Sequence, residues 1–198
     1  MRIAIVGGIG SGKSEVLKTA RQMGFACLSA DEINSELLET PEYAVKVSEI
    51  FPSVVKDGKV DRFALAQIVF SDGEALRKLN ALAHPRILKR IECEKASPLI
   101  VEMPLLPKEC ENGFFEATVF VDTPFLTRLK RLRKRGMTVR QAMARIRAQV
   151  KPVVLGKSAA VVIKNSGSLQ SLKRRATQVL KELTDGLSAG LDVGDRKR

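Results

Sequence analysis

Five short apolar runs along the chain predict β-strands. They are rich in β-branched side chains and are shorter than a typical helix. The runs cover residues 2–6, 25–28, 99–103, 117–121 and 159–163. Segments with apolar residues at helical spacing separate most of them. Such alternation is typical of an α/β fold with a five-stranded parallel sheet flanked by helices.

Helical periodicity fills the long interval between the second and third runs, residues 32–96. Asp61 is a good N-cap for one of the helices there. Pro85 is expected to separate a helix over residues 74–83 from another over residues 86–95, because proline cannot donate a helical hydrogen bond. We therefore expect a helical subdomain that covers a substrate.

Two basic helices after the fourth run are expected to form a lid. Gly136 ends the first of them, and Thr138 with Gln141 forms a capping box that starts the second. A closing helix over residues 169–183 and a frayed tail follow. The predicted division of the single domain is a core of residues 1–31, 97–123 and 156–183, a helical subdomain of residues 32–96, a lid of residues 124–155 and a disordered tail of residues 184–198.

The residues after the first predicted strand form a phosphate-binding motif. Gly7 to Ser14 fit the pattern G-x-x-x-x-G-K-[ST] at every fixed position, and the motif lies between a strand and a helix. Backbone N–H groups of such a loop bind phosphates together with the positive end of the following helix. We expect Lys13 to reach the β- and γ-phosphates of a nucleotide and Ser14 to bind Mg²⁺. The other residues expected to contact the nucleotide are Gly8, Ile9, Gly10, Ser11, Gly12 and Glu15.

Two acidic residues lie at or near the ends of predicted strands. Asp31 follows the second strand, and Glu102 lies near the end of the third. Because the carboxyl ends of parallel strands meet at one edge of a sheet, we expect both near the phosphate motif. Asp31 is a candidate base and Glu102 a candidate magnesium ligand. The alternative interpretations are a helix N-cap for Asp31 and a surface glutamate for Glu102.

The chain carries a formal net charge of +12, unevenly distributed. Residues 123–180 contain no Asp or Glu, and Arg131 with Arg135 can share one helix face there, as can Arg140 with Arg147. Three interpretations are open: a nucleic-acid surface, a cluster that binds polyphosphate, and a solvated helix face. One Tyr, no Trp and no recognisable nucleic-acid motif argue against nucleic acid, because stacking side chains are scarce.

Several features of the sequence bear on where in the cell the protein is found. No apolar run approaches the roughly 18 residues of a membrane helix, so no membrane span is expected. The first predicted strand begins at the second residue, so no signal peptide is expected. Three cysteines without metal-ligand spacing favour a reducing, cytoplasmic location. The sequence does not indicate an oligomeric state.

A set of motifs in this order and spacing resembles the dephospho-CoA kinase family. Beyond the phosphate motif, the set comprises Ala30-Asp31, Val60-Asp61-Arg62, Asn80 through His84-Pro85, Pro104-Leu105-Leu106 and the arginine-rich segment from Arg128 to Gln149. The motifs together cover nearly the whole chain. The resemblance implies a P-loop NTPase fold and an enzyme that transfers the γ-phosphoryl group of ATP to the ribose 3′-hydroxyl of dephospho-CoA, giving coenzyme A and ADP.

The resemblance also implies roles for individual residues. ATP and Mg²⁺ are the expected cofactors. Asp31 is implied as the base or orienting group for the 3′-hydroxyl, while Lys13, Arg131 and Arg140 would stabilise the transferring phosphoryl group. Asn165 would lie near adenine. The residues implied on the acceptor side are Arg62, His84, Pro104, Leu105 and Leu106. For His84, a structural role at the junction of two helices is favoured over a proton shuttle, because the following proline restrains the backbone there.

Five positions depart from the pattern of the family. Ser29 stands where the first of two acids is usual, and Val6 where a threonine is usual. Leu155 and Ala160 stand where a basic and an acidic residue are common, and the glutamate expected after Pro-Leu-Leu comes only at Glu109. These departures keep open a reduced activity and a relaxed or altered acceptor.

The alternative functions are a P-loop NTPase or kinase with a different acceptor and a nucleic-acid-associated nucleotide switch. The switch is disfavoured because Lys164-Asn165-Ser166 lacks the aspartate and the order of a guanine-binding motif.

Overall fold

The computed structural model describes residues 1–104, 106–107, 110, 113–147 and 161–188. Predictions that involve Leu105, Glu109, Gln149, Leu155 or Ala160 lie outside the described residues, as do the end of the predicted lid and most of the predicted tail. The chain divides into two compact units. The first consists of residues 1–28 and the residues from 96 onward, and the second is Ser29–Lys95.

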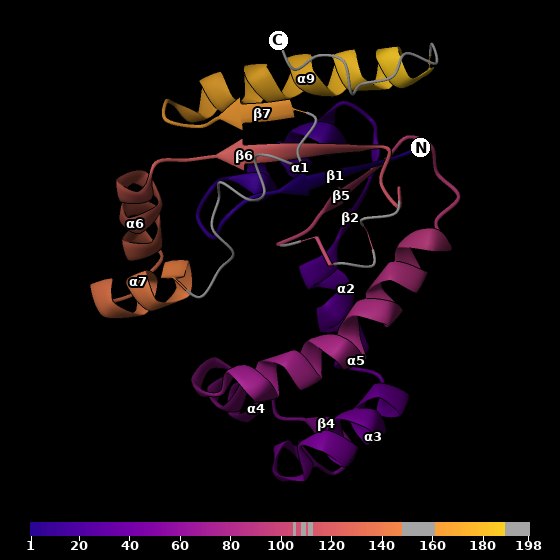
Figure 1. Cartoon of the computed structure of the whole chain (residues 1–198), viewed down its shortest axis with the longest axis vertical. Coiled ribbons are helices and arrows are strands. Elements are labelled where there is room, and N and C mark those ends of the chain that lie inside the picture. Colours follow the sequence, from indigo (N-terminus) through magenta and orange to yellow (C-terminus); the bar gives the residue numbers. More distant parts are fainter. Residues whose placement is uncertain (105, 108–109, 111–112, 148–160, 189–198) are drawn as a thin grey trace. The chain divides into compact units, whose positions relative to one another are not determined.

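A five-stranded parallel sheet forms the centre of the first unit, in the order β2-β5-β1-β6-β7 (Figure 1). Its strands are β1 (Arg2–Val6), β2 (Ala26–Ser29), β5 (Leu99–Glu102), β6 (Ala117–Asp122) and β7 (Val161–Lys164). In the middle strand, Ile3 is paired with Ile100 of β5 and with Ala117 of β6. Residues 3–6 are fully buried, as expected for a strand covered on both faces. The predicted five-stranded parallel sheet is confirmed.

The helices described in the first unit are α1 (Lys13–Gln22), α6 (Phe125–Lys134), α7 (Val139–Arg147) and α9 (Leu169–Ser188). Buried side chains of α1 and α9, among them Val16, Leu17 and Leu180, form one core with those of the sheet. Helix α9 continues past the predicted end at residue 183, and buried Thr184 donates its hydroxyl to the carbonyl of Leu180 at 2.9 Å.

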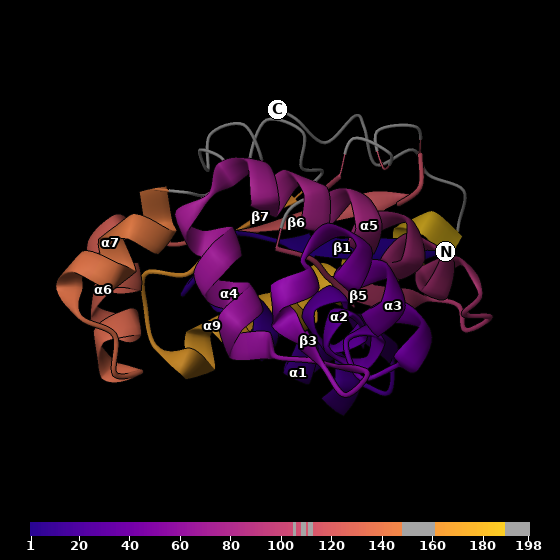
Figure 2. The same ribbon diagram turned by 90° about the horizontal axis from the view of Figure 1, so that it is seen from below.

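Helices α6 and α7 lie beyond the carboxyl end of β6 in both views (Figures 1 and 2). The predicted capping box at the start of α7 is present. The backbone N–H of Thr138 donates to Oε1 of Gln141 at 3.0 Å, and the N–H of Gln141 donates to Oγ1 of Thr138 at 3.2 Å. No helix among the described residues is long and apolar enough to span a bilayer.

The second unit is mainly helical. Its elements are α2 (Ala30–Leu37), α3 (Pro41–Ile50), a 3₁₀ turn (Pro52–Val54), β3 (Val55–Lys56), β4 (Lys59–Val60), α4 (Arg62–Ser71) and α5 (Gly73–Glu92). Tyr43 and Val47 of α3 pack with Leu65 and Val69 of α4 in a core of its own. Asp61 caps α4 as predicted, accepting from the N–H groups of the second and third helical residues at 3.0 Å.

The structure differs from the sequence prediction at two places in this unit. A small antiparallel hairpin surrounds the predicted turn at Asp57 and Gly58, both of which have positive φ. Helix α5 is continuous through Pro85, where two separate helices were expected. The proline ring is exposed, and the flanking buried residues Ala83 and Ile87 keep both halves packed. Packing of both halves therefore offsets the one hydrogen bond lost at proline.

Candidate active site

The loop between β1 and α1 has the backbone of a phosphate-binding loop. Gly10 and Gly12 have φ values of 75° and 99°, a left-handed conformation that favours glycine. Helix α1 begins at Lys13, and the N–H groups of Glu15 and Val16 donate to the carbonyl of Gly12 at 3.1 and 3.2 Å. The positive end of α1 therefore lies directly after the glycine-rich turn.

The carbonyl of Ser11 is held from three sides. It accepts hydrogen bonds from Oγ1 of Thr123 at 2.8 Å, from Nδ2 of Asn165 at 2.7 Å and from Nη1 of Arg131 at 3.2 Å. In a trans peptide, C=O and N–H point in opposite directions. Fixing the Ser11 carbonyl therefore also fixes the direction of the Gly12 N–H, which is one of the groups that such a loop offers to phosphate.

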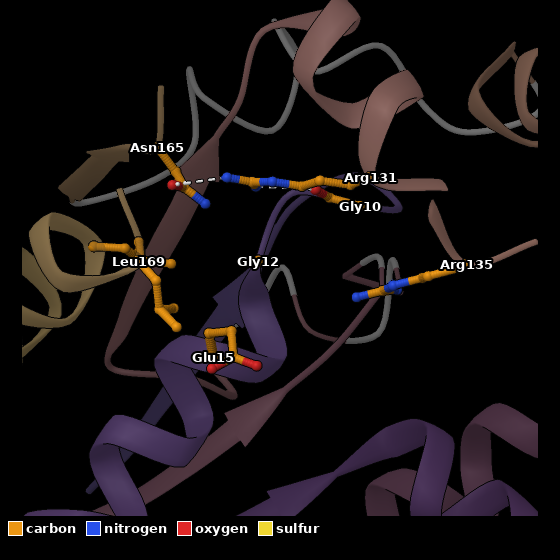
Figure 3. A pocket seen from close by; sticks show the side chains of 8 residues that line it. Gly10, Gly12, Glu15, Arg131, Arg135, Asn165 and Leu169 are labelled. Carbon is orange, nitrogen blue, oxygen red and sulfur yellow. Dashed lines mark hydrogen bonds between the residues drawn. The ribbon is translucent and has the colours of Figure 1, made fainter. Parts of the chain in front are cut away.

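Asn165 directly follows β7 and is 2% exposed. Its amide nitrogen is bonded to the Ser11 carbonyl, and its amide oxygen accepts from Nη2 of Arg131 at 3.2 Å (Figure 3). A Cβ on Gly12 would lie 2.6 Å from the amide nitrogen. The side chain expected near adenine is thus a structural support of the phosphate-binding loop.

A cavity of about 330 Å³ opens beside this loop. Figure 3 shows Arg131 and Arg135 reaching toward it from one side, with Glu15 and Leu169 on the other. Burial and the neighbouring Arg135 lower the pKa of Arg131 from its usual value, but a guanidinium remains charged in proteins. Apolar walls combined with cationic donors suit a nucleotide. The lining residues are Gly10, Gly12, Glu15, Arg131, Arg135, Asn165, Leu169 and Leu172.

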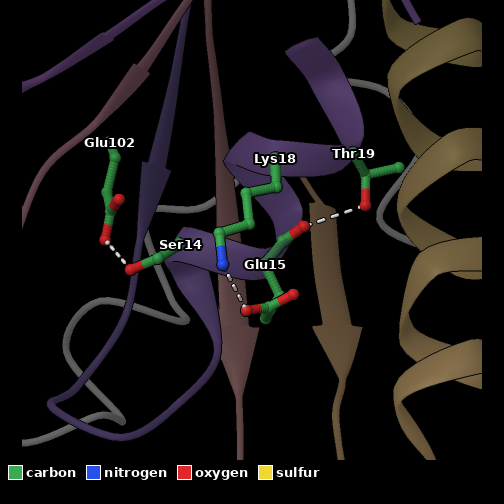
Figure 4. Close-up of polar contacts among 5 residues, drawn as sticks. All are labelled: Ser14, Glu15, Lys18, Thr19 and Glu102. Atoms are coloured by element: carbon green, nitrogen blue, oxygen red, sulfur yellow. Dashed lines mark hydrogen bonds and ion pairs between the residues drawn. The ribbon is translucent and has the colours of Figure 1, made fainter. Parts of the chain in front are cut away.

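Ser14 and Glu102 form a hydrogen-bonded pair at the carboxyl ends of the strands. The hydroxyl of Ser14 donates to Oε1 of Glu102 at 3.0 Å (Figure 4). Glu102 is 7% exposed. Glu102 is therefore not the surface glutamate of the alternative interpretation. A hydroxyl and a carboxylate are ligands that Mg²⁺ accepts. On the other side of α1, Glu15 pairs with Lys18 at 3.1 Å.

The second unit carries three of the candidate residues. Asp31 is an exposed residue in the first turn of α2. The N-cap of α2 is Ser29, whose hydroxyl accepts from the N–H of Glu32 at 3.4 Å, so the N-cap interpretation of Asp31 is wrong.

Arg62 donates to the Ser35 carbonyl at 2.6 Å and to Glu39 at 3.0 Å. His84, the third candidate, is half-buried within α5.

Comparison with known proteins shows which family this loop and its supports belong to. The family model for dephospho-CoA kinase matches residues 1–171. The chain belongs to the dephospho-CoA kinase family. A curated dephospho-CoA kinase from Thermus thermophilus is 38% identical over 194 residues, which cover 95% of this chain and 94% of that protein.

Solved structures agree with this assignment to the dephospho-CoA kinase family. A crystal structure from Thermus thermophilus has a TM-score of 0.77 at 35% identity, covering 93% of this chain and 98% of that one. The dephospho-CoA kinase from Campylobacter jejuni has a TM-score of 0.66 at 27% identity, covering 94% and 98%. The chain is thus a P-loop kinase.

Within this dephospho-CoA kinase family member, the first unit brings together the phosphate-binding loop, Glu102, Arg131 and Asn165. Arg140 is exposed on α7, and Pro104 and Leu106 are half-buried after β5. Of the positions that depart from the family pattern, Ser29 acts as a helix cap and Val6 is fully buried in β1.

Sequence reasoning missed two residues that contact the loop, Thr123 and Arg128. Thr123 directly follows β6, a position where site residues are common in parallel sheets. Arg128 precedes fully buried Leu132 by one helical turn, so it lies on the inward stripe of α6. Thr123 belongs to no motif. Arg128 begins the arginine-rich segment, but nothing in that segment distinguishes it from the neighbouring arginines as the residue that contacts the loop.

Proposed function

We propose that this kinase transfers the γ-phosphoryl group of ATP to the ribose 3′-hydroxyl of dephospho-CoA. Membership of the family supports the acceptor. The single observation that supports the chemistry is the phosphate-binding loop whose Ser11 carbonyl is held by three side chains, next to the hydrogen bond from Ser14 to buried Glu102. This loop binds the triphosphate with preset N–H groups, which is the main protein contribution to phosphoryl transfer.

Lys13, Ser14 and Glu102 act at the transferring end of ATP. Lys13 neutralises charge on the β- and γ-phosphates. Ser14 and Glu102 would hold Mg²⁺, which when bound neutralises the phosphate oxygens further. Arg131, which lines the cavity, and Arg140 of α7 add positive charge around the leaving ADP.

Asp31 serves the acceptor. It accepts the proton of the 3′-hydroxyl as that oxygen bonds to the γ-phosphorus, while the bond from the γ-phosphorus to the β–γ bridging oxygen breaks and ADP leaves. Arg62, His84 and the Pro104–Leu106 segment bind the rest of the acceptor. Asp31 is exposed in the first turn of α2, which leaves its carboxylate available to a substrate.

The acceptor is tested by coupled ADP-release assays with dephospho-CoA and, in separate reactions, with nucleosides, nucleotides and DNA. We expect acceptor-dependent ADP release with dephospho-CoA alone, and coenzyme A as the product by mass spectrometry. Release stimulated by another small molecule would instead support a kinase with a different acceptor, and release stimulated by DNA the nucleotide-switch alternative.

Asp31→Asn tests the role of the base. Turnover should fall by about 10²–10⁴, since general-base groups contribute in this range, and the KM for ATP should stay near the parent value. A loose transition state places the loss toward the low end. Ser29, not Asp31, caps α2, so thermal stability should be unchanged. Glu36→Gln, an exposed change on the same helix, is the matched control. Parent-like turnover in Asp31→Asn would remove Asp31 from the mechanism.

A further inference from the structure

Arg128 of α6 is a charged side chain in an interior position. It is 4% exposed, and burial lowers its pKa while nearby Asp122 opposes that shift. Arginine is rarely buried to this extent without a specific role, because removing its charge from water is costly. Its environment is therefore informative about function.

The Arg128 side chain lies against the outer side of the phosphate-binding loop. Its Nε donates to the carbonyl of Ile9 at 2.8 Å. The gap shared by Arg128, Gly8 and the end of β6 has a volume of only about 10 Å³. That is no more than the space of a single water, so the guanidinium fills the region behind the loop.

The Ile9 bond fixes one peptide plane of the loop. The carbonyl of Ile9 and the N–H of Gly10 belong to the same trans peptide and point in opposite directions. When Arg128 holds the carbonyl outward, the Gly10 N–H points to the inner side of the loop. Arg128 thus fixes the direction of the Gly10 N–H, as the three donors to the Ser11 carbonyl fix the direction of the Gly12 N–H.

The glycine at position 8 is independent evidence that the Arg128 guanidinium lies against the loop. A Cβ on Gly8 would lie 2.8 Å from Nη1 of Arg128 and closer still to Nη2. Gly8 does not have the left-handed φ seen at Gly10 and Gly12, so its backbone alone does not require glycine. The buried, hydrogen-bonded guanidinium cannot easily move aside. It is therefore the side chain of Arg128 that excludes a Cβ at position 8.

We propose that Arg128 is a positioning residue that holds the phosphate-binding loop in its nucleotide-binding form, and that its guanidinium is the reason position 8 is glycine. The proposal rests on nucleotide binding at this loop, as in the proposed function, but it does not depend on the acceptor. A residue that only stabilised the fold would change the melting temperature and leave nucleotide affinity unchanged.

A double-mutant cycle with Gly8→Ala and Arg128→Met tests it. Methionine reaches only as far as Nε, so it removes the atoms that would overlap an alanine Cβ. Binding of a fluorescent ATP analogue, without acceptor, gives the affinities. We expect each single change to weaken binding about 10-fold, the scale of one charge-assisted hydrogen bond. The double variant should bind within about 3-fold of Arg128→Met alone, because the overlap is gone.

Two controls make the result specific. Gly10→Ala should not be rescued by Arg128→Met, because φ at Gly10 is 75° whatever the side chain at 128. Arg133→Met, an exposed change on the same helix, should bind like the parent. If Arg128→Met does not fold, Arg128→Gln replaces it in the cycle, since glutamine also ends at the level of Nε and lacks the atoms that a Cβ at position 8 would overlap.

The outcomes separate clearly. A double variant that loses little more affinity than Arg128→Met alone supports the proposal. A rise in the KM of Arg128→Met for ATP, with an unchanged KM for dephospho-CoA, supports it as well. Parent-like binding by Gly8→Ala, or a double variant whose loss of affinity is the product of the two single losses, about 100-fold, would overturn it. So would an Arg128→Met protein that loses thermal stability but keeps its nucleotide affinity. A wrong acceptor assignment would leave all these binding results unchanged.

Discussion

Replacing Asn165 by alanine removes two hydrogen bonds that support the phosphate-binding loop. One joins its amide nitrogen to the Ser11 carbonyl at 2.7 Å, and the other joins its amide oxygen to Arg131 at 3.2 Å. A neutral hydrogen bond contributes about 1 kcal/mol and one to a charged group about 1.5–3 kcal/mol. Ser11 keeps two other donors and Arg131 keeps two other acceptors, so neither is orphaned.

We therefore expect Asn165→Ala to lower the free energy of unfolding by about 2.5–4 kcal/mol. For a chain of this size, that corresponds to a fall in Tm of about 5–16 °C. Nucleotide affinity should also fall, because the Gly12 N–H loses part of its orientation. Calorimetry and fluorescence titration with an ATP analogue measure the two effects, and Ser166→Ala, an exposed neighbour, is the control.

A different pattern would refute this reasoning. If Asn165 acts on adenine, Asn165→Ala would keep its Tm within about 1–2 °C of the parent, because a ligand contact contributes nothing to the stability of the ligand-free protein. It would instead lose its preference for ATP over GTP. That combination would move Asn165 from loop support to base recognition.

Two further predictions concern the loop and the start of α2. Lys13→Ala should lower turnover at least about 100-fold, the usual scale for losing transition-state charge stabilisation, with a native circular-dichroism spectrum. Near-parent ADP release would argue against the loop assignment. Ser29→Ala should cost stability at the low end of about 0.5–2 kcal/mol, because the cap bond is long at 3.4 Å. Urea unfolding measures the loss, and Ser29→Asp, which can still cap, should show little of it.

The sheet and the phosphate-binding loop could be predicted because their signals are local. The apolar run at residues 2–6 and the glycine spacing after it need no distant residue to be interpreted. Pro85 shows the opposite case. Its local preference favours a break, but buried Ala83 and Ile87 on either side hold one continuous helix. That packing is invisible in a local window.

The supports of the loop were harder to predict for a related reason. The basic segment of α6 contains several arginines, and composition does not say which of them points inward. Arg128 is buried and contacts the loop from behind, whereas Arg133 is exposed. Asn165 was recognised as a site residue, but only the structure assigns both of its amide groups to the loop and Arg131.

The loop can reach its nucleotide-binding form only after the later parts of the chain that support it have been synthesised. Ser11 depends on Thr123 and Asn165, which are 112 and 154 positions later in the chain. The strand before the loop is equally dependent, because its neighbours β5 and β6 begin at residues 99 and 117. Such distant contacts form slowly. While the ribosome is still translating the middle of the message, the emerging N-terminal segment carries an apolar strand without its neighbours and a glycine loop without its shape. Truncated chains that end before Asn165 should therefore fail to bind nucleotide and should need protection from aggregation.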